Sequence, residues 1–171
     1  MAERTLLLLR HAKSSWDEPA LEDAERPLAP RGRRAAAAIG KRLARRGPEI
    51  DYVLCSPSQR TRETLALLGL PEATRVRFEP KLYLASARAL LTQIRGVPAR
   101  TRCLLVIAHD PGLDHLVRML APEGRPKALR RVAAGFPTGA LAELRFERRS
   151  WKRLDDGSAF LRRFTRPRDL A

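Results

Sequence analysis

The sequence predicts an α/β protein, a three-layer α/β/α sandwich around a mainly parallel sheet. Short apolar runs recur along the chain, as expected of strands buried on both faces of a parallel sheet. A turn and a stretch of helical spacing follow most of these runs, so strand, turn and helix repeat in order. The 171 residues, with 44% hydrophobic content, suit one core, and we expect a single domain over residues 1–171.

The first predicted strand covers residues 4–9, a continuous apolar run. Residues 11–30 are polar, acidic and interrupted by prolines, which predicts a long loop over the C-terminal end of that strand. Loops of that length are commonly functional. An alanine-rich stretch with helical spacing then predicts a helix over residues 31–46, which Gly47 and Pro48 end.

A second unit of strand and helix begins at residues 52–55, another short apolar run. Ser56 and Pro57 come next and are suited to the N-cap and the first turn of a helix. They predict a helix over residues 58–68.

Two further units follow. Residues 76–78 predict a third strand, and residues 87–95 predict a third helix. The strongly apolar run 103–108 predicts a fourth strand. Asp110 and Pro111 then form a cap for a helix that we expect to end near residue 120.

The last third of the chain has a different pattern. Residues 140–146 alternate apolar and polar side chains, and residues 160–164 do so less cleanly. This pattern predicts strands near a sheet edge, connected across residues 155–157, and an edge position would allow one of them to run antiparallel.

The net charge of +15, carried mostly by arginine, allows an acidic partner such as a phosphorylated protein, a phosphorylated small molecule or nucleic acid. Basic residues are spread along the whole chain, and aromatic residues make up only 5% of it. The interleaved stacking residues of a single-strand binder are therefore missing, and nucleic acid is disfavoured. Most of this charge is explained by a solvated surface.

Cys55 and Cys103 lie within or at the end of apolar runs, where a free thiol packs as a small hydrophobe, and neither has the spacing of a zinc or redox site. No apolar run approaches the length of a membrane span, and Glu3 and Arg4 interrupt the region where a signal peptide would become apolar. We expect a cytoplasmic protein without a membrane partner. The sequence sets no oligomeric state.

Candidate site residues follow three of the predicted strands. Arg10 and His11 come directly after the first strand, and Arg60 lies in the first turn of the helix after the second. His109 comes directly after the fourth strand. Ligands of parallel α/β sheets bind beyond the carboxyl ends of the strands, so we expect these four side chains to meet there, beside a helix N-terminus suited to an anion.

This set suits phosphate chemistry. A neutral His11 imidazole is a competent nucleophile toward phosphorus. Arg10 and Arg60 would lower the pKa of that imidazole and bind the phosphoryl oxygens. His109, when protonated, would donate to the same oxygens. Four cationic or near-cationic side chains make a metal redundant, so we expect no metal and no other cofactor.

The sequence around these positions resembles the histidine phosphatase superfamily and, within it, the small bacterial phosphohistidine phosphatases of the SixA type. Three motifs occur in order, each after an apolar run, and the resemblance spans nearly the full length. The motifs are LLLLRHAKS (6–14), CSPSQRTRET (55–64) and VIAHDPGL (106–113), joined by the similar segments RPL (26–28), RG (31–32), FPTGA (136–140) and PRDL (167–170).

The resemblance implies a phosphoglycerate mutase-like fold and a phosphatase that acts on phosphohistidine in proteins, including the phosphotransfer domains of signalling relays. It implies His11 as the phosphorylated nucleophile and His109 as the second pocket histidine. It also implies Arg10 and Arg60 as phosphate ligands. Ala12 stands where the family usually has glycine.

A second departure from the family concerns the general acid. Many members carry a glutamate shortly after the third strand, whereas residues 81–84 contain no carboxylate. An alkoxide leaving group needs a proton more than an imidazole does, so the departure favours phosphohistidine over phosphate esters. Of the remaining carboxylates, those of the 11–30 loop, including Asp23, are expected to be solvated, and Asp110 is expected to cap a helix.

Three alternatives stay open. The chain could be a small-molecule phosphomonoesterase of the same superfamily, or a non-catalytic basic module that binds phosphorylated protein or nucleic acid. Cys55 and Arg60 also resemble the loop of cysteine phosphatases. Their C-x4-R spacing is one residue short of that motif, and Pro57 removes a backbone donor that such a loop needs.

Overall fold

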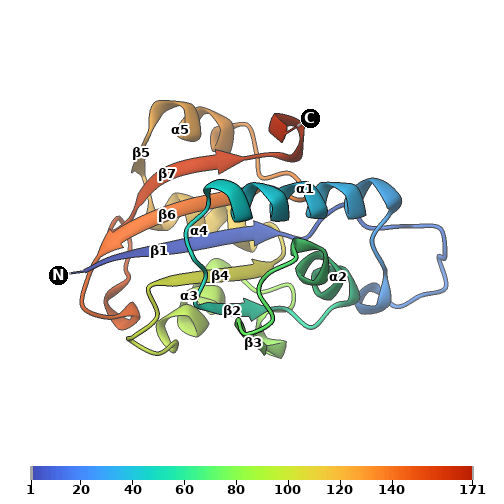
Figure 1. Cartoon of the computed structure of the whole chain (residues 1–171), viewed down its shortest axis with the longest axis horizontal. Coiled ribbons are helices and arrows are strands. Elements are labelled where there is room, and N and C mark those ends of the chain that lie inside the picture. The colour runs from blue at the N-terminus through green and yellow to red at the C-terminus, as the bar shows by residue number, and fades with distance from the viewer. Residues whose placement is uncertain (1, 171) are drawn as a thin grey trace.

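The computed structural model describes residues 2–170, which form a seven-stranded sheet with helices on both faces (Figure 1). The strands are β1 (Glu3–Arg10), β2 (Tyr52–Cys55), β3 (Arg75–Phe78), β4 (Cys103–Ala108), β5 (Glu123–Gly124), β6 (Leu141–Glu147) and β7 (Phe160–Thr165). The helices are α1 (Pro30–Arg46), α2 (Gln59–Leu68), α3 (Ala87–Arg95), α4 (Gly112–Leu120) and α5 (Pro126–Ala133), with short 3-10 turns η1 (Asp23–Glu25), η2 (Pro80–Leu82), η3 (Trp151–Arg153) and η4 (Pro167–Leu170).

The strand order is β3-β2-β4-β1-β6-β7-β5. β1, β2, β3 and β4 are parallel, and β6 is antiparallel to both of its neighbours, β1 and β7. The predicted mainly parallel sheet is therefore confirmed. The antiparallel strand lies inside the sheet, however, and not at the edge as expected.

The alternating pattern of β6 has another cause than an edge position. Ala142 and Leu144 are buried in the same cluster as α4, whereas Leu141 packs with α1 on the opposite face. On the face of Leu141, the next two positions are Glu143 and Arg145, and both are partly exposed. One face of β6 is thus open to solvent along part of its length, although the strand is paired on both sides.

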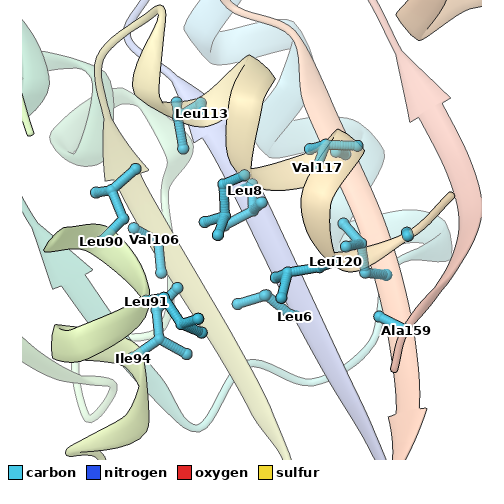
Figure 2. Close-up of a cluster of buried hydrophobic side chains, with 14 of the residues drawn as sticks. Leu6, Leu8, Leu90, Leu91, Ile94, Val106, Leu113, Val117, Leu120 and Ala159 are labelled. Carbon is cyan, nitrogen blue, oxygen red and sulfur yellow. The ribbon is translucent and has the colours of Figure 1, made fainter. Parts of the chain in front are cut away.

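Two apolar clusters fill the layers between sheet and helices. On one face, Leu6 and Leu8 of β1 pack with α3 and α4, as Figure 2 shows. On the other face, Leu7 and Leu9 pack with Ile39 of α1 and with α2. Successive residues of β1 point to opposite faces, and all four leucines are at most 1% exposed, which explains the uninterrupted apolar run.

The limits of α1 to α4 agree with prediction to within about a residue, but one N-cap differs and one helix was missed. The N-cap of α2 is Ser58, whose hydroxyl accepts from the Thr61 N–H, and not Ser56. Helix α5 was not predicted. Its two buried residues, Ala128 and Val132, are one turn apart on a segment that also carries Lys127, Arg130 and Arg131. Within residues 2–170, no helix is long and apolar enough to cross a bilayer.

Candidate active site

The carboxyl ends of β1, β2 and β4 form the floor of the site. Main-chain hydrogen bonds just beyond the strand ends hold the following loops together. The His11 N–H donates to the Ala108 carbonyl at 3.2 Å, and the Ser56 N–H donates to the Ile107 carbonyl at 3.0 Å. These bonds place the residues after each strand side by side. The imidazole rings of His11 and His109 lie with centroids 5.4 Å apart.

His11 is 7% exposed and carries one short hydrogen bond, between its Nδ1 and the Ala12 carbonyl at 2.8 Å. A carbonyl only accepts, so Nδ1 carries the proton and Nε2 keeps its lone pair. The pKa of His11 is lowered to about 4, first by burial and then by the charges of Arg60, Arg10 and Arg26. The ring is therefore neutral at pH 7. Burial is the largest single cause and exceeds the effect of each arginine, whereas the sequence suggested only the arginines.

His109 is fixed by Ser56, whose Oγ lies 2.7 Å from its Nε2, and by Arg60, whose guanidinium lies 3.4 Å from its Nδ1. Burial, the neighbouring His11 and the charge of Arg60 lower the pKa of His109 to about 3. A guanidinium only donates, so Nδ1 is the acceptor and Nε2 carries the proton. His109 is thus neutral here, and the expected donor role to phosphate oxygens requires uptake of a proton together with the anion.

Arg10 and Arg60 are held by main-chain and carboxylate oxygens. The Arg10 guanidinium donates to the Phe136 carbonyl at 2.7 Å. Arg60 is 4% exposed and donates to the Asp23 carbonyl at 2.7 Å and to its carboxylate at 3.0 Å. The structure brings together all four residues that the sequence singled out.

The 11–30 loop folds back over the site, and its contacts were not foreseen. The Ser15 N–H donates to the Pro27 carbonyl at 2.8 Å, and the Ala29 N–H donates to the Lys13 carbonyl at 2.9 Å. This folding brings Arg26, 7% exposed, next to the strand ends, where its charge lowers the pKa of His11.

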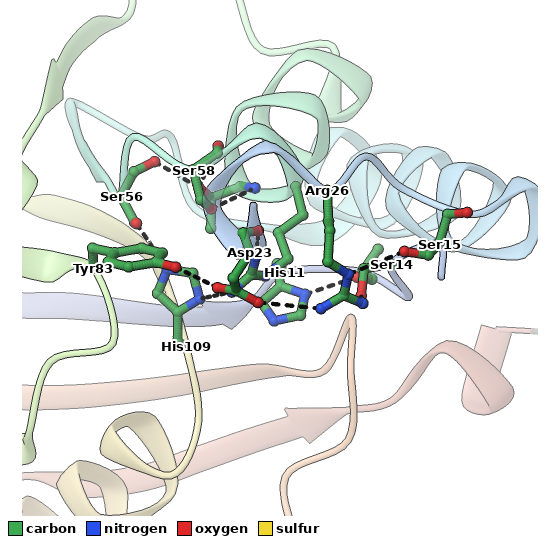
Figure 3. Close-up of polar contacts among 12 residues, drawn as sticks. His11, Ser14, Ser15, Asp23, Arg26, Ser56, Ser58, Tyr83 and His109 are labelled. Atoms are coloured by element: carbon green, nitrogen blue, oxygen red, sulfur yellow. Dashed lines mark hydrogen bonds and ion pairs between the residues drawn. The ribbon is translucent and has the colours of Figure 1, made fainter. Parts of the chain in front are cut away.

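Arg26 is one of the site residues that sequence reasoning missed. Its guanidinium donates to Ser14 Oγ at 2.6 Å and to the Asp23 carboxylate at 3.2 Å (Figure 3). The Trp16 ring stacks on it, with the ring centroid 3.2 Å away. The segment Arg26-Pro27-Leu28 resembled the SixA type, and that resemblance was the only signal in the sequence for this residue.

Asp23 is exposed to solvent, as predicted for this loop, but its carboxylate also takes part in the site, which was not predicted. Its carboxylate accepts from Arg26, Arg60 and the Tyr83 hydroxyl (Figure 3). The Tyr83 hydrogen bond and the two arginines hold the pKa of Asp23 below its usual range. Asp23 is therefore an anion beside the two guanidinium groups.

The other candidates differ in their surroundings. Cys55 is fully buried, and burial raises the pKa of its thiol to about 12, so it does not supply the thiolate that a cysteine phosphatase requires. Asp110 accepts from the Asp114 N–H at 3.1 Å, which agrees with a capping role, and burial raises its pKa. His115, the third histidine of the chain, is exposed on α4. In residues 2–170, no group of three or more His, Cys, Asp or Glu side chains is arranged to hold a metal ion.

Comparison with known proteins assigns this geometry to a family. Residues 6–83 match the model of the histidine phosphatase superfamily (branch 1). The chain is 36% identical to an uncharacterized protein of Mycobacterium tuberculosis (strain ATCC 25618 / H37Rv) over 162 residues, which cover 94% of this chain and 100% of the other.

Solved structures with a similar fold include proteins of the SixA type. A proposed phosphohistidine phosphatase SixA from Nakamurella multipartitia is 32% identical, with a TM-score of 0.84 and 98% of each chain covered. A protein histidine phosphatase SixA complexed with tungstate has the same fold, with a TM-score of 0.79 at 23% identity over 98% of this chain and 99% of the other. A phosphoglycerate mutase from Plasmodium falciparum also matches, so the predicted phosphoglycerate mutase-like fold is confirmed.

Proposed function

Since the chain belongs to the histidine phosphatase superfamily and is of the SixA type, we propose that it hydrolyses phosphohistidine on proteins through a phosphorylated His11. The observation that carries this proposal is the state of His11, a neutral imidazole with the lone pair of its Nε2 free and guanidinium groups around it. Such a nitrogen can attack phosphorus without first losing a proton.

The reaction would proceed in two steps. The Nε2 lone pair of His11 forms a bond to phosphorus while the bond from phosphorus to the substrate imidazole breaks, and the departing nitrogen takes up a proton. Water then attacks the phosphorylated His11 and releases inorganic phosphate. Arg10, Arg26 and Arg60 would bind the phosphoryl oxygens and stabilise the charge that develops on them.

The substrate preference is supported by the Asp23 carboxylate, which pairs with Arg26 and Arg60. Two arginines and Tyr83 keep Asp23 ionised, so it is a poor proton donor at neutral pH. An imidazole leaves more easily than an alkoxide without such a donor. Asp110 favours the alternative, a small-molecule phosphomonoesterase, because burial raises its pKa and it lies beside Arg10.

Trapping of the intermediate tests the mechanism. We expect acid-labile phosphate to accumulate on the protein during turnover of a phosphohistidine protein and to map to the peptide that contains His11. His11→Ala should lower kcat by about 10⁴-fold or more, whereas Cys55→Ser should retain turnover. Label on another residue, or loss of activity in Cys55→Ser alone, would contradict the proposal. Faster turnover of an alkyl phosphate than of phosphohistidine would favour the alternative.

We propose further that the protein acts in the cytoplasm. Cys55 and Cys103 are both buried free thiols, a state typical of reducing compartments. Fractionation of cells that produce the full chain tests this setting.

A further inference from the structure

A hollow of about 880 Å³ lies directly beside the reaction centre. Its walls are the N-terminal half of α1, the segment 134–138 after α5, and the C-terminal turn η4. Figure 1 shows this turn close to α1. Arg10 lines the hollow and also lowers the pKa of His11, so the hollow and the candidate active site share a wall.

The charge of the hollow is strongly positive. Asp110 is its one lining carboxylate among the described residues. Two of its arginines, Arg131 and Arg166, are already paired with Asp169. Four other lining side chains have no ion pair or hydrogen bond of their own in the part of the chain that the structure describes: Lys13, Arg31, Arg34 and Arg168. Uncompensated like charges around a concavity attract an anionic partner.

The placement of these charges indicates the kind of anion. At the reaction centre, Arg26 and Arg60 are at most 7% exposed and are fixed by several hydrogen bonds, as a single phosphoryl group requires. The four free cations of the hollow are exposed, and they come from three separate segments of the chain. Exposed cations from separate segments suit an extended acidic surface better than one compact phosphate.

The apolar part of the lining also favours a polypeptide partner. It includes Ala35 and Ala38 of α1 and the proline rings of Pro137 and Pro167. A bound polypeptide segment would pack its backbone against these apolar residues. Its acidic side chains would pair with the surrounding cations.

We propose that this hollow docks an acidic segment of the phosphoprotein substrate, next to the phosphohistidine that enters the active site. The inference rests on the proposed function and adds a substrate class to it, proteins with acidic residues near the phosphorylated histidine. The positive charges of the hollow speed the association with the acidic substrate and so raise kcat/KM. The residues around His11 carry out the chemical step.

Two phosphohistidine peptides of equal length test the proposal, one flanked by Asp and Glu and the other by Asn and Gln, with free phosphohistidine as the reference substrate. The variant combines Arg31→Gln, Arg34→Gln and Arg168→Gln. The ratio of kcat/KM between the acidic and neutral peptides should fall about tenfold in this variant at low ionic strength, and the difference should vanish at high salt.

A matched control variant also removes three positive charges, but at the C-terminal end of α1. Lys41, Arg45 and Arg46 are exposed there and do not line the hollow. Their replacement by Gln should leave the peptide ratio unchanged. An unchanged ratio in the Arg31/Arg34/Arg168 variant would overturn the proposal, and so would an equal loss on free phosphohistidine. Stronger inhibition by single-stranded DNA than by an unphosphorylated acidic peptide of equal charge would assign the hollow to nucleic acid instead.

Failure of the proposed function gives a different result. In that case wild-type protein hydrolyses none of the three substrates. Fluorescence anisotropy with the labelled, unphosphorylated acidic peptide then tests docking alone. Binding that is weakened in the Arg31/Arg34/Arg168 variant, and not in the control, supports the hollow as a docking site, and no binding contradicts it.

Discussion

Asp23 shows how one residue can change role with its surroundings. In the sequence it is one of several acidic residues in a polar loop. In the structure its carboxylate lies between the guanidinium groups of Arg26 and Arg60 and accepts from Tyr83. It therefore occupies donors that a phosphoryl group would also use, and it repels the phosphate dianion.

Removal of this negative charge should strengthen product inhibition. In Asp23→Asn the side chain keeps its shape and loses its charge, so we expect inorganic phosphate to inhibit more strongly, by about three- to tenfold in the inhibition constant. Steady-state kinetics with increasing phosphate measure this change. Glu22→Gln, an exposed neighbour in the same loop, is the control. Weaker inhibition in Asp23→Asn would mean that Asp23 chiefly positions Arg60.

The positions of four site residues could be predicted from the sequence, and those of their partners could not. Arg10 is the last residue of β1, and His11 and His109 directly follow β1 and β4. The location of Arg60 depends on one helix start. Arg26 and Asp23 reach the site only because the 11–30 loop folds back on itself. That folding depends on long-range contacts, which no local pattern in a polar loop reveals.

At the scale of elements, the strands of the parallel half and helices α1 to α4 could be predicted because most have a strong local signal. Apolar runs mark β1, β2 and β4, whereas the exposed edge strand β3 is marked only by Val76 and Phe78, which alternate with two arginines. Capping residues mark several helix starts. Helix α5 was missed because only Ala128 and Val132 are buried on it. The position of β6 inside the sheet is set by pairing with β1 and β7, which the alternation of a single strand does not encode.

The contact between α1 and the active-site loop depends on Gly32. A Cβ atom at this position would lie 2.1 Å from the Lys13 carbonyl oxygen, so a side chain would push α1 away from the loop that follows His11. Gly32→Ala should lower the free energy of unfolding by about 1–3 kcal/mol and reduce kcat/KM with it. Urea denaturation and steady-state kinetics measure the two effects.

Gly96 provides the control for that substitution. A Cβ there would come no closer than 3.4 Å to the Gln93 carbonyl, and the backbone has an ordinary helical conformation. Gly96→Ala should therefore change the stability little. Similar stability in both variants would show that α1 and the loop adjust to a side chain at position 32.

At the scale of the whole molecule, the two buried histidines couple stability to pH. Their pKa values fall from 6.5 to about 4 for His11 and to about 3 for His109. Between pH 6.5 and 4, an unfolded chain binds protons at these rings and the folded chain does not, so acid favours unfolding. Asp23, whose pKa is also lowered, acts in the same direction, whereas Asp110 opposes it.

The free energy of unfolding should therefore decrease on the order of a few kcal/mol as the pH falls from 7 to 4.5. Urea denaturation at several pH values measures this slope. The double variant His11→Gln/His109→Gln should have a clearly smaller slope, and His115→Gln, on the surface of α4, should have the slope of the wild type. Equal slopes in all three proteins would show that the two rings do not resist protonation.

The burial of both thiols has a consequence for how the protein would withstand oxidants. Hydrogen peroxide attacks thiolates, and the shielding that raises the pKa of Cys55 and Cys103 to about 12 leaves neither in that form. With an imidazole as the attacking group, the proposed reaction has no sulfur that must stay reduced. The protein would then keep removing phosphate at peroxide concentrations that inactivate enzymes with a thiolate nucleophile.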